Sequence, residues 1–274
     1  MTNVVIGAAS GMGISVARQL APRGRLLIAD RDPAGVERLA AELGGDVAAL
    51  PCDITDQAQV DALFAQVDSL DALDALVITA GISAAHMERG RPIFEVNLVG
   101  MARVLRAAEP LLRPGTVAVG VASQSGYLVP ENPALFAVLE DPLAPDFYAK
   151  LGTFFDYEDP TLAYQMSKRG VHRLIRSKAA AWGAKGARIM SVSPGINDTP
   201  MNQALEADRP IMLDIIRNSP LGRRGTPDEI ANVISFVTSD AASLLTGSDV
   251  LADGGMVSVL PATWDGKIRT TDPS

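Results

Sequence analysis

Residues 2–13 read Thr2-Asn-Val-Val-Ile-Gly-Ala-Ala-Ser-Gly-Met-Gly13, a short apolar run that ends in a glycine-rich turn. A helical pattern of apolar residues follows from Ile14 to Leu20. Glycine has no Cβ, so backbone amides in such a turn can approach a phosphate at the positive end of the helix. The spacing is G-x-x-x-G-x-G, which differs from G-x-G-x-x-G, and a tight connection without a ligand is the alternative. The candidate phosphate contacts are Gly7, Ser10, Gly11, Met12 and Gly13.

Short runs of β-branched residues and leucine recur every few tens of residues. We expect seven strands, at Asn3–Ile6, Arg25–Ala29, Val47–Leu50, Ala75–Thr79, Thr116–Val121, Arg188–Val192 and Asp249–Ala252. The segments between them have apolar residues at i, i+3 and i+4, which is typical of helices. Examples are Pro33–Leu43, Gln57–Val67 and Glu95–Leu111. This alternation predicts an α/β fold with a doubly wound parallel sheet covered on both faces.

The composition limits the class of protein. The chain has 274 residues, 47% of them hydrophobic, and one domain spanning 1–274 is expected. Its 24 Lys and Arg against 32 Asp and Glu give a net charge of −8, which argues against binding nucleic acid. Apolar stretches stay shorter than the roughly 20 residues that cross a bilayer, so no membrane partner is expected. The N-terminus does not resemble a secretion signal, and a single cysteine, Cys52, fits a cytoplasmic protein.

One segment interrupts the alternation of strands and helices. Residues 126–161 lie between an expected strand and an expected helix, and they are rich in proline, acidic and aromatic residues. Loops without internal structure rarely exceed about 12–15 residues in a compact domain. We therefore expect an insertion with a helical element at Pro133–Leu139.

Acidic residues follow the second and third expected strands. Asp30 stands where a carboxylate can accept hydrogen bonds from the adenosine ribose of a dinucleotide and repel a 2′-phosphate. This favours NAD over NADP, although Arg31 could pair with such a phosphate. Asp53, followed by Ile54, could contact the adenine amino group. On spacing alone, Asp53 could equally cap a helix that begins at Thr55.

Tyr164 and Lys168 stand four residues apart in Tyr164-Gln-Met-Ser-Lys168, so both side chains lie on one face of an expected helix. A phenol has a pKa of about 10, and a nearby ammonium lowers that pKa toward the range of general acid–base catalysis. Such a pair is also common on exposed helices. By itself it does not indicate catalysis.

The order of these features carries more information than any one of them. After the glycine turn and the acid of strand two come Asn97 in Phe-Glu-Val-Asn-Leu-Val-Gly, Ser123, the Tyr164/Lys168 pair, Pro194-Gly195 and the stretch Thr246–Gly255. This order resembles the short-chain dehydrogenase/reductase family over nearly the whole chain. The resemblance implies a single Rossmann-type domain, a nicotinamide dinucleotide and oxidoreductase activity.

Carried over position by position, the resemblance implies a role for each residue. Tyr164 would exchange a proton with the substrate oxygen, and Ser123 would orient that oxygen. Lys168 would lower the pKa of Tyr164 and hold the nicotinamide ribose. Asn97, at a local distortion of its helix, would position a water. Further cofactor contacts would come from Ala80, Gly81, Pro194, Gly195, Ile196 and, at the carboxamide, Thr199.

Two positions need comment against the family pattern. After the fourth strand the family usually has Asn-Asn-Ala-Gly, whereas this chain has Ile78-Thr-Ala-Gly81, so support of the central strand could differ. Ser125 competes with Ser123 for the catalytic role. Ser123 is preferred because Ser123-Gln-Ser-Gly126 matches the S-x-x-G of the family.

The remaining polar candidates receive structural interpretations. His86 and His172 lie in no cluster with the spacing of metal ligands, and we expect neither a metal site nor a hydrolytic triad. Ser191 and Ser193 fall beside the sixth strand, where hydrogen bonds at a strand end are the better interpretation.

The interval from Ser123 to Tyr164 is longer than in most members of the family. In this interval, and in stretches such as Leu162–Lys168, the chain is similar to the bacterial 3α-hydroxysteroid dehydrogenase/carbonyl reductases. The likeness implies a hydrophobic secondary alcohol or ketone as substrate, a steroid among the candidates. Apolar side chains of the insertion could line a substrate pocket or equally contact a subunit neighbour: Leu128, Phe136, Phe147, Phe154 and Phe155.

Residues 197–217 form a second candidate element beside the site. In the family this stretch often closes over the substrate. Its apolar residues Met201, Leu205, Ile211 and Met212 fit a lid, and ordinary packing of an amphipathic helix is the alternative. The resemblance also implies a homodimer or homotetramer, with one interface altered by the insertion.

These observations predict an NAD-dependent oxidoreductase that interconverts a hydrophobic secondary alcohol and its ketone, with Tyr164 as acid and base. A regulator that senses NAD without turnover is the alternative on the same fold. The set of Asn97, Ser123, Tyr164 and Lys168 argues against that alternative.

Overall fold

Seven parallel strands form one sheet in the order β3-β2-β1-β4-β5-β6-β7. The computed structural model describes all residues except 71, 86, 202–210 and 260–274. The strands are β1 (Thr2–Ile6), β2 (Arg25–Asp30), β3 (Val47–Pro51), β4 (Leu73–Ile78), β5 (Val117–Val121), β6 (Arg188–Pro194) and β7 (Asp249–Ala252). The predicted parallel α/β sheet is confirmed, with strand ends that differ by at most two residues.

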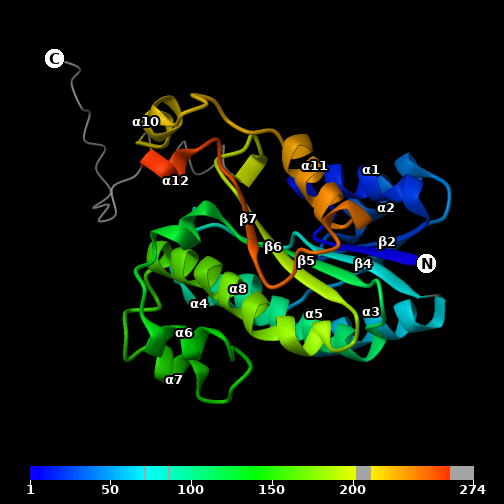
Figure 1. The fold of residues 1–274 in the computed structure, drawn as a ribbon, viewed down its shortest axis with the longest axis horizontal. Coiled ribbons are helices and arrows are strands. Elements are labelled where there is room, and N and C mark those ends of the chain that lie inside the picture. Colours follow the sequence, from blue (N-terminus) through cyan, green and yellow to red (C-terminus); the bar gives the residue numbers. More distant parts are fainter. Residues whose placement is uncertain (71, 86, 202–210, 260–274) are drawn as a thin grey trace.

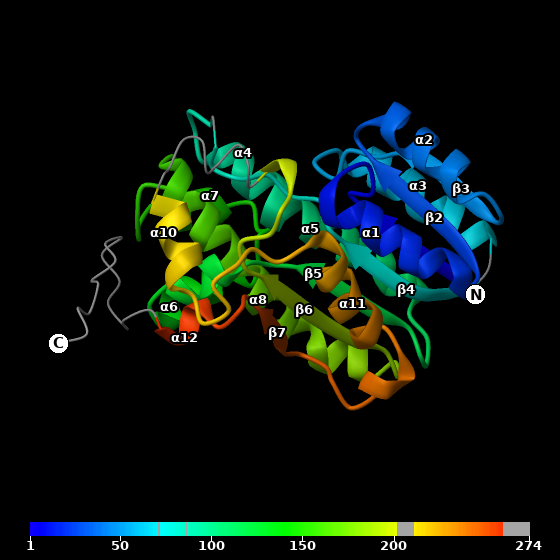
Figure 2. The same ribbon diagram turned by 90° about the horizontal axis from the view of Figure 1, so that it is seen from above.

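Helices cover both faces of this sheet (Figures 1 and 2). One face carries α1 (Gly11–Leu20), α2 (Pro33–Leu43) and α11 (Pro227–Val237). The other carries α3 (Gln57–Leu70), α4 (Arg91–Phe94), α5 (Met101–Ala108) and α8 (Pro160–Gly183). Short 3-10 helices lie at Ala21–Arg23, Glu109–Leu111, Gln124–Leu128 and Asp240–Ala242.

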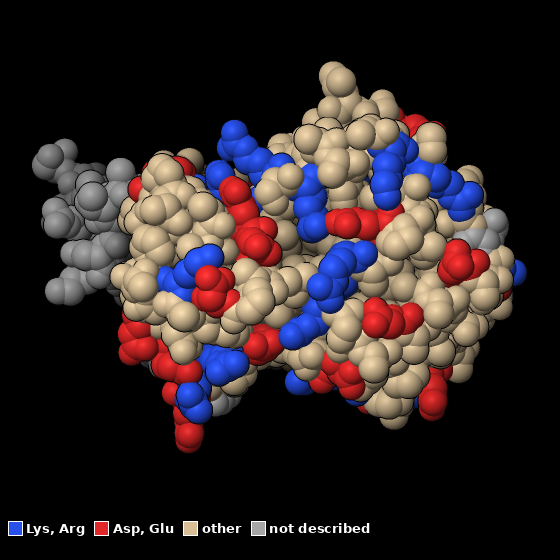
Figure 3. Space-filling model, turned by 90° about the horizontal axis from the view of Figure 1, so that it is seen from below, with Lys and Arg blue, Asp and Glu red and all other residues tan. Residues whose placement is uncertain are grey.

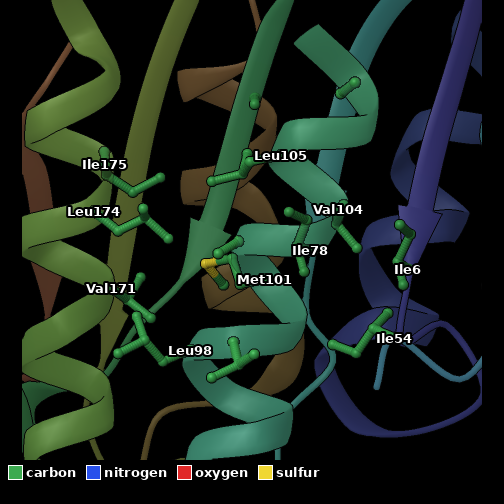
Figure 4. Close-up of a cluster of buried hydrophobic side chains, with 14 of the residues drawn as sticks. Ile6, Ile54, Ile78, Leu98, Met101, Val104, Leu105, Val171, Leu174 and Ile175 are labelled. Atoms are coloured by element: carbon green, nitrogen blue, oxygen red, sulfur yellow. The ribbon is translucent and has the colours of Figure 1, made fainter. Parts of the chain in front are cut away.

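The strands feed two hydrophobic cores because successive side chains point to opposite faces. In β1, Val5 packs toward α1 and α11, whereas Val4 and Ile6 pack toward α3, α5 and α8. Figure 4 shows part of this second core, in which Leu98 and Met101 lie beside Val171 of α8. Strands buried on both faces explain why their sequences are almost entirely apolar.

The long helix α8 begins where the sequence gives a strong start signal. Asp159 is its N-cap and accepts a hydrogen bond from the Leu162 amide at 2.8 Å, and Pro160 occupies the first helical position. The cap fixes the register of the 24-residue helix. Tyr164, Lys168 and His172 therefore follow one another along one face.

The insertion forms two short helices that pack against other helices of the same chain. They are α6 (Pro133–Leu139), at the predicted position, and α7 (Phe147–Leu151). Phe136 and Phe147 are 2% exposed, and Phe147 meets Phe94 edge to face with centroids 6.1 Å apart. Phe155 also contacts the ring of Phe94. These rings thus stabilise the attachment of the insertion to α4 and α8.

Charged groups fasten the same insertion to α8. The guanidinium groups of Arg169 and Arg173 lie 4.7 and 4.9 Å from the ring centre of Phe136, and they pair with Glu131 and Glu140 respectively. Figure 3 shows the resulting mixture of basic and acidic groups on this face of the molecule. Two acidic residues of the insertion are therefore paired with arginines of α8.

The expected lid segment is described only in part. Helix α10 (Ile211–Asn218) packs through Ile215 and Ile216 against Ile196 and Met256, which belongs to α12 (Met256–Val259). Leu205 and the side chain of Ile211 lie outside the described residues. Within the described part of the chain, no helix is both long and apolar enough to cross a membrane.

Candidate active site

The glycine turn lies at the carboxyl edge of the sheet, where the strand order reverses between β1 and β4. A cleft opens at this kind of switch point in doubly wound sheets. Gly7 has φ +92°, and a Cβ there would stand 2.3 Å from the Ala80 amide nitrogen. A Cβ on Gly13 would stand 2.0 Å from the Gly7 carbonyl oxygen. Both positions therefore require glycine for the turn to pass so close to β4 and α1.

The start of α1 is suited to an anion. Ser10 is its N-cap in extended conformation, and the Ser10 side chain makes no capping hydrogen bond to the helix amides. Gly11 has φ +50°, and the nearest atom to a Cβ there would be Thr199 Cγ2 at 3.5 Å. The N-terminus of the helix, which is the positive end of its dipole, thus lines a cavity.

A cavity of about 190 Å³ runs along this edge of the sheet. It gathers twelve of the residues predicted to bind the cofactor: Gly7, Ser10, Gly11, Met12, Gly13, Asp30, Arg31, Asp53, Ile54, Ala80, Gly81 and Thr199. Residues from five separate segments thus meet around one elongated space. The glycine turn, the N-terminus of α1 and the acidic residues Asp30 and Asp53 that line this cavity fit a dinucleotide.

Asp30 is held in place by the backbone. Its Oδ2 accepts a hydrogen bond from the Ala9 amide in the glycine turn, and its Oδ1 accepts one from the Asp32 amide, both at 3.0 Å. The carboxylate therefore supports the turn as well as facing the cavity. This supporting contact was not apparent from the sequence.

Asp53 has a capping role, which the sequence left as one of two possibilities, but it caps a turn and not a helix that begins at Thr55. Its Oδ1 accepts hydrogen bonds from the amide and the hydroxyl of Thr55, at 2.9 and 2.8 Å. Helix α3 begins later, at Gln57, where Asp56 bonds the Ala58 amide. Asp53 therefore caps a turn before α3, and it still lines the cavity.

A second cavity adjoins the first and holds the candidate catalytic side chains. Ser123, Tyr164 and Lys168 line it together with Pro194, Gly195 and Ile196. Thr199, Gly81 and Met12 line both cavities. The apolar part of the wall is formed by Ile82, Ile196, Met201 and Met212, so two of the expected lid residues border this space.

None of the apolar insertion residues named from the sequence lines this cavity. Phe136 and Phe147 are buried against α8 and α4, as described above. Of the two roles that the sequence left open for these side chains, the pocket wall does not fit Phe136 and Phe147. Both side chains pack within the chain instead.

Tyr164 lies beside Ser123 and is partly buried. Burial raises the pKa of Tyr164, and a hydrogen bond with the Ser123 side chain opposes that rise. Lys168 Nζ lies 5.9 Å from the centre of the Tyr164 ring. We expected the ammonium to set a lowered pKa, whereas burial dominates in the structure. The contact with Tyr164 also distinguishes Ser123 from Ser125, whose amide bonds Ser123 Oγ at 3.2 Å.

Lys168 is 5% exposed and donates a hydrogen bond to the Val121 carbonyl oxygen at 3.0 Å. Burial lowers the pKa of Lys168 to about 8. A Cβ on Gly81 would stand 3.4 Å from Lys168 Nζ and 3.2 Å from Asn97 Oδ1. Glycine at this position therefore keeps the space beside the ammonium open.

Asn97 lies in a π-helical turn, Glu95–Gly100, between α4 and α5. This is the local distortion that the family resemblance implied. The side chain is fully buried and bonds the backbone of Ile82 and the hydroxyl of Ser167. Ser123, Tyr164 and Lys168 line the second cavity, whereas Asn97 does not. Asn97 instead hydrogen-bonds the backbone of Ile82, which belongs to the cavity wall.

Thr79 stands after β4, where the family pattern has asparagine. Its hydroxyl lies 3.0 Å from the carbonyl oxygens of both Ile6 and Gly7. The Thr79 amide also bonds the Ile6 carbonyl, at 2.8 Å. The end of β4 is therefore tied to the glycine turn by a threonine. The departure from Asn-Asn-Ala-Gly marked this position in the sequence but not its contact.

His172 is packed among polar side chains from other elements. Its Nε2 lies 2.7 Å from Ser193 Oγ and 3.6 Å from Asp249 Oδ1. Burial lowers the pKa of His172 to about 4, although Asp249 opposes that shift. The sequence spacing could not reveal this cluster, because its members come from α8, β6 and β7.

Comparison with known proteins agrees with this geometry. A family model described as enoyl-(acyl carrier protein) reductase matches residues 7–139 and 151–257. The chain belongs to the short-chain dehydrogenase/reductase family. It is therefore an oxidoreductase, and the cofactors of this family are nicotinamide dinucleotides.

Relatives in the short-chain dehydrogenase/reductase family align over most of the chain. Galactitol 2-dehydrogenase (L-tagatose-forming) of Cereibacter sphaeroides is 32% identical, over 92% of this chain and 92% of the relative. The 3-alpha-hydroxysteroid dehydrogenase/carbonyl reductase of Comamonas testosteroni is 28% identical, over 95% of this chain and 98% of the relative. The predicted likeness to the latter group is thus found, at a lower identity than to the galactitol enzyme.

A solved short-chain dehydrogenase/reductase structure has the same fold. It is described as a glucose/ribitol dehydrogenase from Brucella melitensis, and it covers 93% of this chain and 96% of its own. The TM-score is 0.77 at 26% identity. The doubly wound architecture is thereby confirmed.

Proposed function

We propose that this protein is an NAD(H)-dependent oxidoreductase that interconverts a hydrophobic secondary alcohol and its ketone, with Tyr164 as acid and base. One observation carries the proposal. Tyr164, Ser123 and Lys168 share a cavity that continues into the space above the glycine turn. This arrangement also favours turnover over a role as an NAD sensor, since a sensor has no need of a proton-transfer group in the cavity.

A bound nicotinamide dinucleotide supplies the hydride acceptor for oxidation and the hydride donor for reduction. The protein supplies position and proton transfer. Ser123 Oγ hydrogen-bonds the substrate oxygen and directs it toward Tyr164. During oxidation the phenolate of Tyr164 takes the hydroxyl proton while the carbinol carbon loses hydride. During reduction the neutral phenol returns that proton to the carbonyl oxygen.

The raised pKa of Tyr164 and the ammonium of Lys168 have opposite effects on this proton transfer. Burial favours the neutral phenol, which suits ketone reduction. The positive charge of Lys168 stabilises the phenolate that alcohol oxidation requires. Both directions therefore draw on the same pair, and oxidation should accelerate with rising pH.

The choice of NAD rests on Asp30. Its carboxylate, fixed by two backbone amides, places negative charge at the cavity where a 2′-phosphate would lie. Arg31 lines the same cavity but belongs to the exposed turn after β2. The fixed charge supports NAD as the preferred cofactor.

The substrate class rests on the lining of the second cavity. Ile82, Ile196, Met201 and Met212 present apolar surface beside Ser123 and Tyr164. A cyclic or steroid-like alcohol fits such a wall, and the hydroxysteroid relative supports this choice. A sugar alcohol is the second candidate, because the galactitol enzyme aligns at higher identity.

The test is a panel of secondary alcohols assayed with NAD and with NADP. It should contain simple cyclic alcohols, hydroxysteroids and sugar alcohols. We expect NAD reduction with cyclic alcohols or steroids, and Tyr164→Phe should abolish it while NADH binding, followed by fluorescence, stays unchanged. Activity confined to sugar alcohols would select the second candidate. Unchanged turnover in Tyr164→Phe would overturn the proposed mechanism.

We also propose a homodimer or homotetramer, in keeping with the habit of the family. The insertion covers part of α8 through α6, so assembly would use other surfaces. Light scattering of the purified protein would give the mass directly. A monomer at micromolar concentration would contradict this proposal.

A further inference from the structure

Five polar side chains meet beside the segment that carries Ser123. We call them the Tyr127 cluster: Tyr127, His172, Ser191, Ser193 and Asp249. Tyr127 Oη donates a hydrogen bond to Asp249 Oδ2 at 2.8 Å, and Ser191 Oγ donates one to Asp249 Oδ1 at 2.5 Å. The rings of Tyr127 and His172 meet edge to face with centroids 5.0 Å apart. The Tyr127 cluster thus joins the 3-10 helix Gln124–Leu128 to α8, β6 and β7.

The Tyr127 cluster contains serine, histidine and aspartate but is no hydrolytic triad. In a triad the histidine uses one ring nitrogen for the serine and the other for the carboxylate. Here Ser193 Oγ and Asp249 Oδ1 both face Nε2 of His172. Ser193 is also fully buried, so a substrate carbonyl cannot reach its hydroxyl.

The protonation states make the Tyr127 cluster a fixed support. Burial and the Asp249 carboxylate raise the pKa of Tyr127, which keeps its hydroxyl as a donor. Burial, opposed by Asp249 and assisted by the cations of Arg169 and Lys168, lowers the pKa of His172 to about 4. At neutral pH the imidazole is uncharged. Asp249 therefore holds the single carboxylate charge of the cluster, satisfied by the two hydroxyl donors.

The Tyr127 cluster is close to the catalytic groups along the chain on both sides. Tyr127 lies four residues after Ser123, within the short helix that Ser123 caps. His172 lies one helical turn after Lys168 on α8. Gly126, next to Tyr127, lies against α8. A Cβ on Gly126 would approach His172 Cε1 to 2.8 Å and the Arg169 amide nitrogen to 3.0 Å. The Ser123 segment is thus pressed directly against α8.

We propose that Tyr127, Asp249 and His172 are positioning residues that set the distance between Ser123 and Tyr164. The proposal rests on the proposed function, since it concerns the geometry of that same reaction. Ser123 and Tyr164 come from different elements, a loop after β5 and helix α8. The bond from Tyr127 to Asp249 anchors the loop to β7, and His172 gives it a rigid surface on α8.

The test compares Tyr127→Phe with Tyr148→Phe. Tyr148 Oη also donates to a carboxylate, Glu95 Oε1, at 2.9 Å, but it lies in the insertion away from both cavities. We expect Tyr127→Phe to lower kcat about ten-fold, since small displacements of reacting groups are costly, with NADH binding unchanged. Tyr148→Phe should leave kcat within about two-fold, the change expected from a stability effect alone.

The pH profile separates positioning from simple stability. The hydrogen bond from Ser123 lowers the pKa of Tyr164, so a loosened Ser123 should move the rise of alcohol oxidation to higher pH. Asp249→Asn keeps an acceptor for Tyr127 and should retain more activity than Asp249→Ala. Asp249→Asn also serves as the second variant if Tyr127→Phe folds poorly. Equal kcat losses in Tyr127→Phe and Tyr148→Phe, or an unshifted profile, would overturn the proposal.

Amide hydrogen exchange tests the same proposal without any turnover. Peptides covering residues 123–128 should exchange faster in Tyr127→Phe than in the wild type, while peptides of β1 and β4 stay unchanged. Unaltered exchange in residues 123–128 would refute the positioning role. If the wild type oxidises no alcohol in the panel, the proposed function fails, and this measurement still decides whether the Tyr127 cluster holds the Ser123 segment.

Discussion

Asn97 bonds both backbone groups of Ile82. Its Oδ1 accepts from the Ile82 amide at 2.8 Å, and its Nδ2 donates to the Ile82 carbonyl at 3.0 Å. Nδ2 also lies 3.2 Å from Ser167 Oγ on α8. Because Ile82 and Gly81 line both cavities, one buried carboxamide ties the wall of the site to α8.

Asn97→Asp should therefore lower both stability and activity. A carboxylate cannot donate to the Ile82 carbonyl, and it places a charge in a fully buried position. We expect a loss of about 2–4 kcal/mol in the free energy of unfolding, measured by urea denaturation at pH 7. Asn232→Asp is the matched control, because Asn232 is exposed and its Oδ1 accepts a hydrogen bond from Gln19, which a carboxylate oxygen also accepts. Similar losses in both variants would contradict this account.

Much of the fold could be predicted from the sequence because strands buried on both faces leave a plain apolar signal. All seven strands, the Tyr164 helix and the helix of the insertion appear where the pattern indicated. The docking of the insertion was not predictable. It depends on the contact of the Phe136 ring with the guanidinium groups of Arg169 and Arg173, which arises only when α6 meets α8.

The candidate site, like the fold, could be predicted only in part. The glycine turn, Asp30, Ser123, Tyr164 and Lys168 follow a fixed order along the chain, and the structure brings them to two adjoining cavities. Contacts between distant segments could not be read from that order. The hydroxyl of Thr79 on the Gly7 carbonyl is one such contact, because nothing local to Thr79 indicates its partner.

Gly13→Ala tests how tightly the glycine turn is packed. The new Cβ would stand 2.0 Å from the Gly7 carbonyl oxygen, so the backbone of the turn has to move. We expect a destabilisation of about 2 kcal/mol or more and loss of NADH binding by fluorescence titration. Gly183→Ala, in α8, meets nothing within 4 Å and should stabilise the protein by about 0.5 kcal/mol. If Gly13→Ala binds NADH like the wild type, the glycine turn does not belong to the cofactor site.

Asp30→Asn should change the preference between cofactors. The amide removes the negative charge that opposes a 2′-phosphate, and it retains one acceptor for the Ala9 or Asp32 amide. We expect the dissociation constant of NAD to rise about ten-fold while that of NADP stays equal or falls, as measured by titration. Asp32→Asn is the control, because asparagine also caps α2 through the Gly35 amide. Equal weakening of NAD and NADP would contradict the ribose assignment.

Acid should destabilise the protein through His172. The pKa of His172 is about 4 in the folded chain, against 6.5 for a free imidazole, so the unfolded chain binds the proton more readily. This contribution to stability is therefore present above pH 6.5 and is lost as the pH falls toward 4. Urea denaturation at pH 7 and pH 4.5 should show a loss larger by about 1–3 kcal/mol in the wild type than in His172→Gln. Parallel losses in the two proteins would show that His172 does not govern acid stability.

Phe136→Ala separates the stability of the insertion from catalysis. Phe136 is 2% exposed and its ring contacts the guanidinium groups of Arg169 and Arg173. Its removal leaves a cavity and ends both cation–ring contacts. A loss of about 3–5 kcal/mol is expected, against less than about 0.5 kcal/mol for Phe154→Ala, whose side chain is partly exposed. Because Phe136 lines neither cavity, KM and kcat of the folded fraction at low temperature should stay near those of the wild type. A change in KM specific to Phe136→Ala would instead mean that the insertion reaches the substrate.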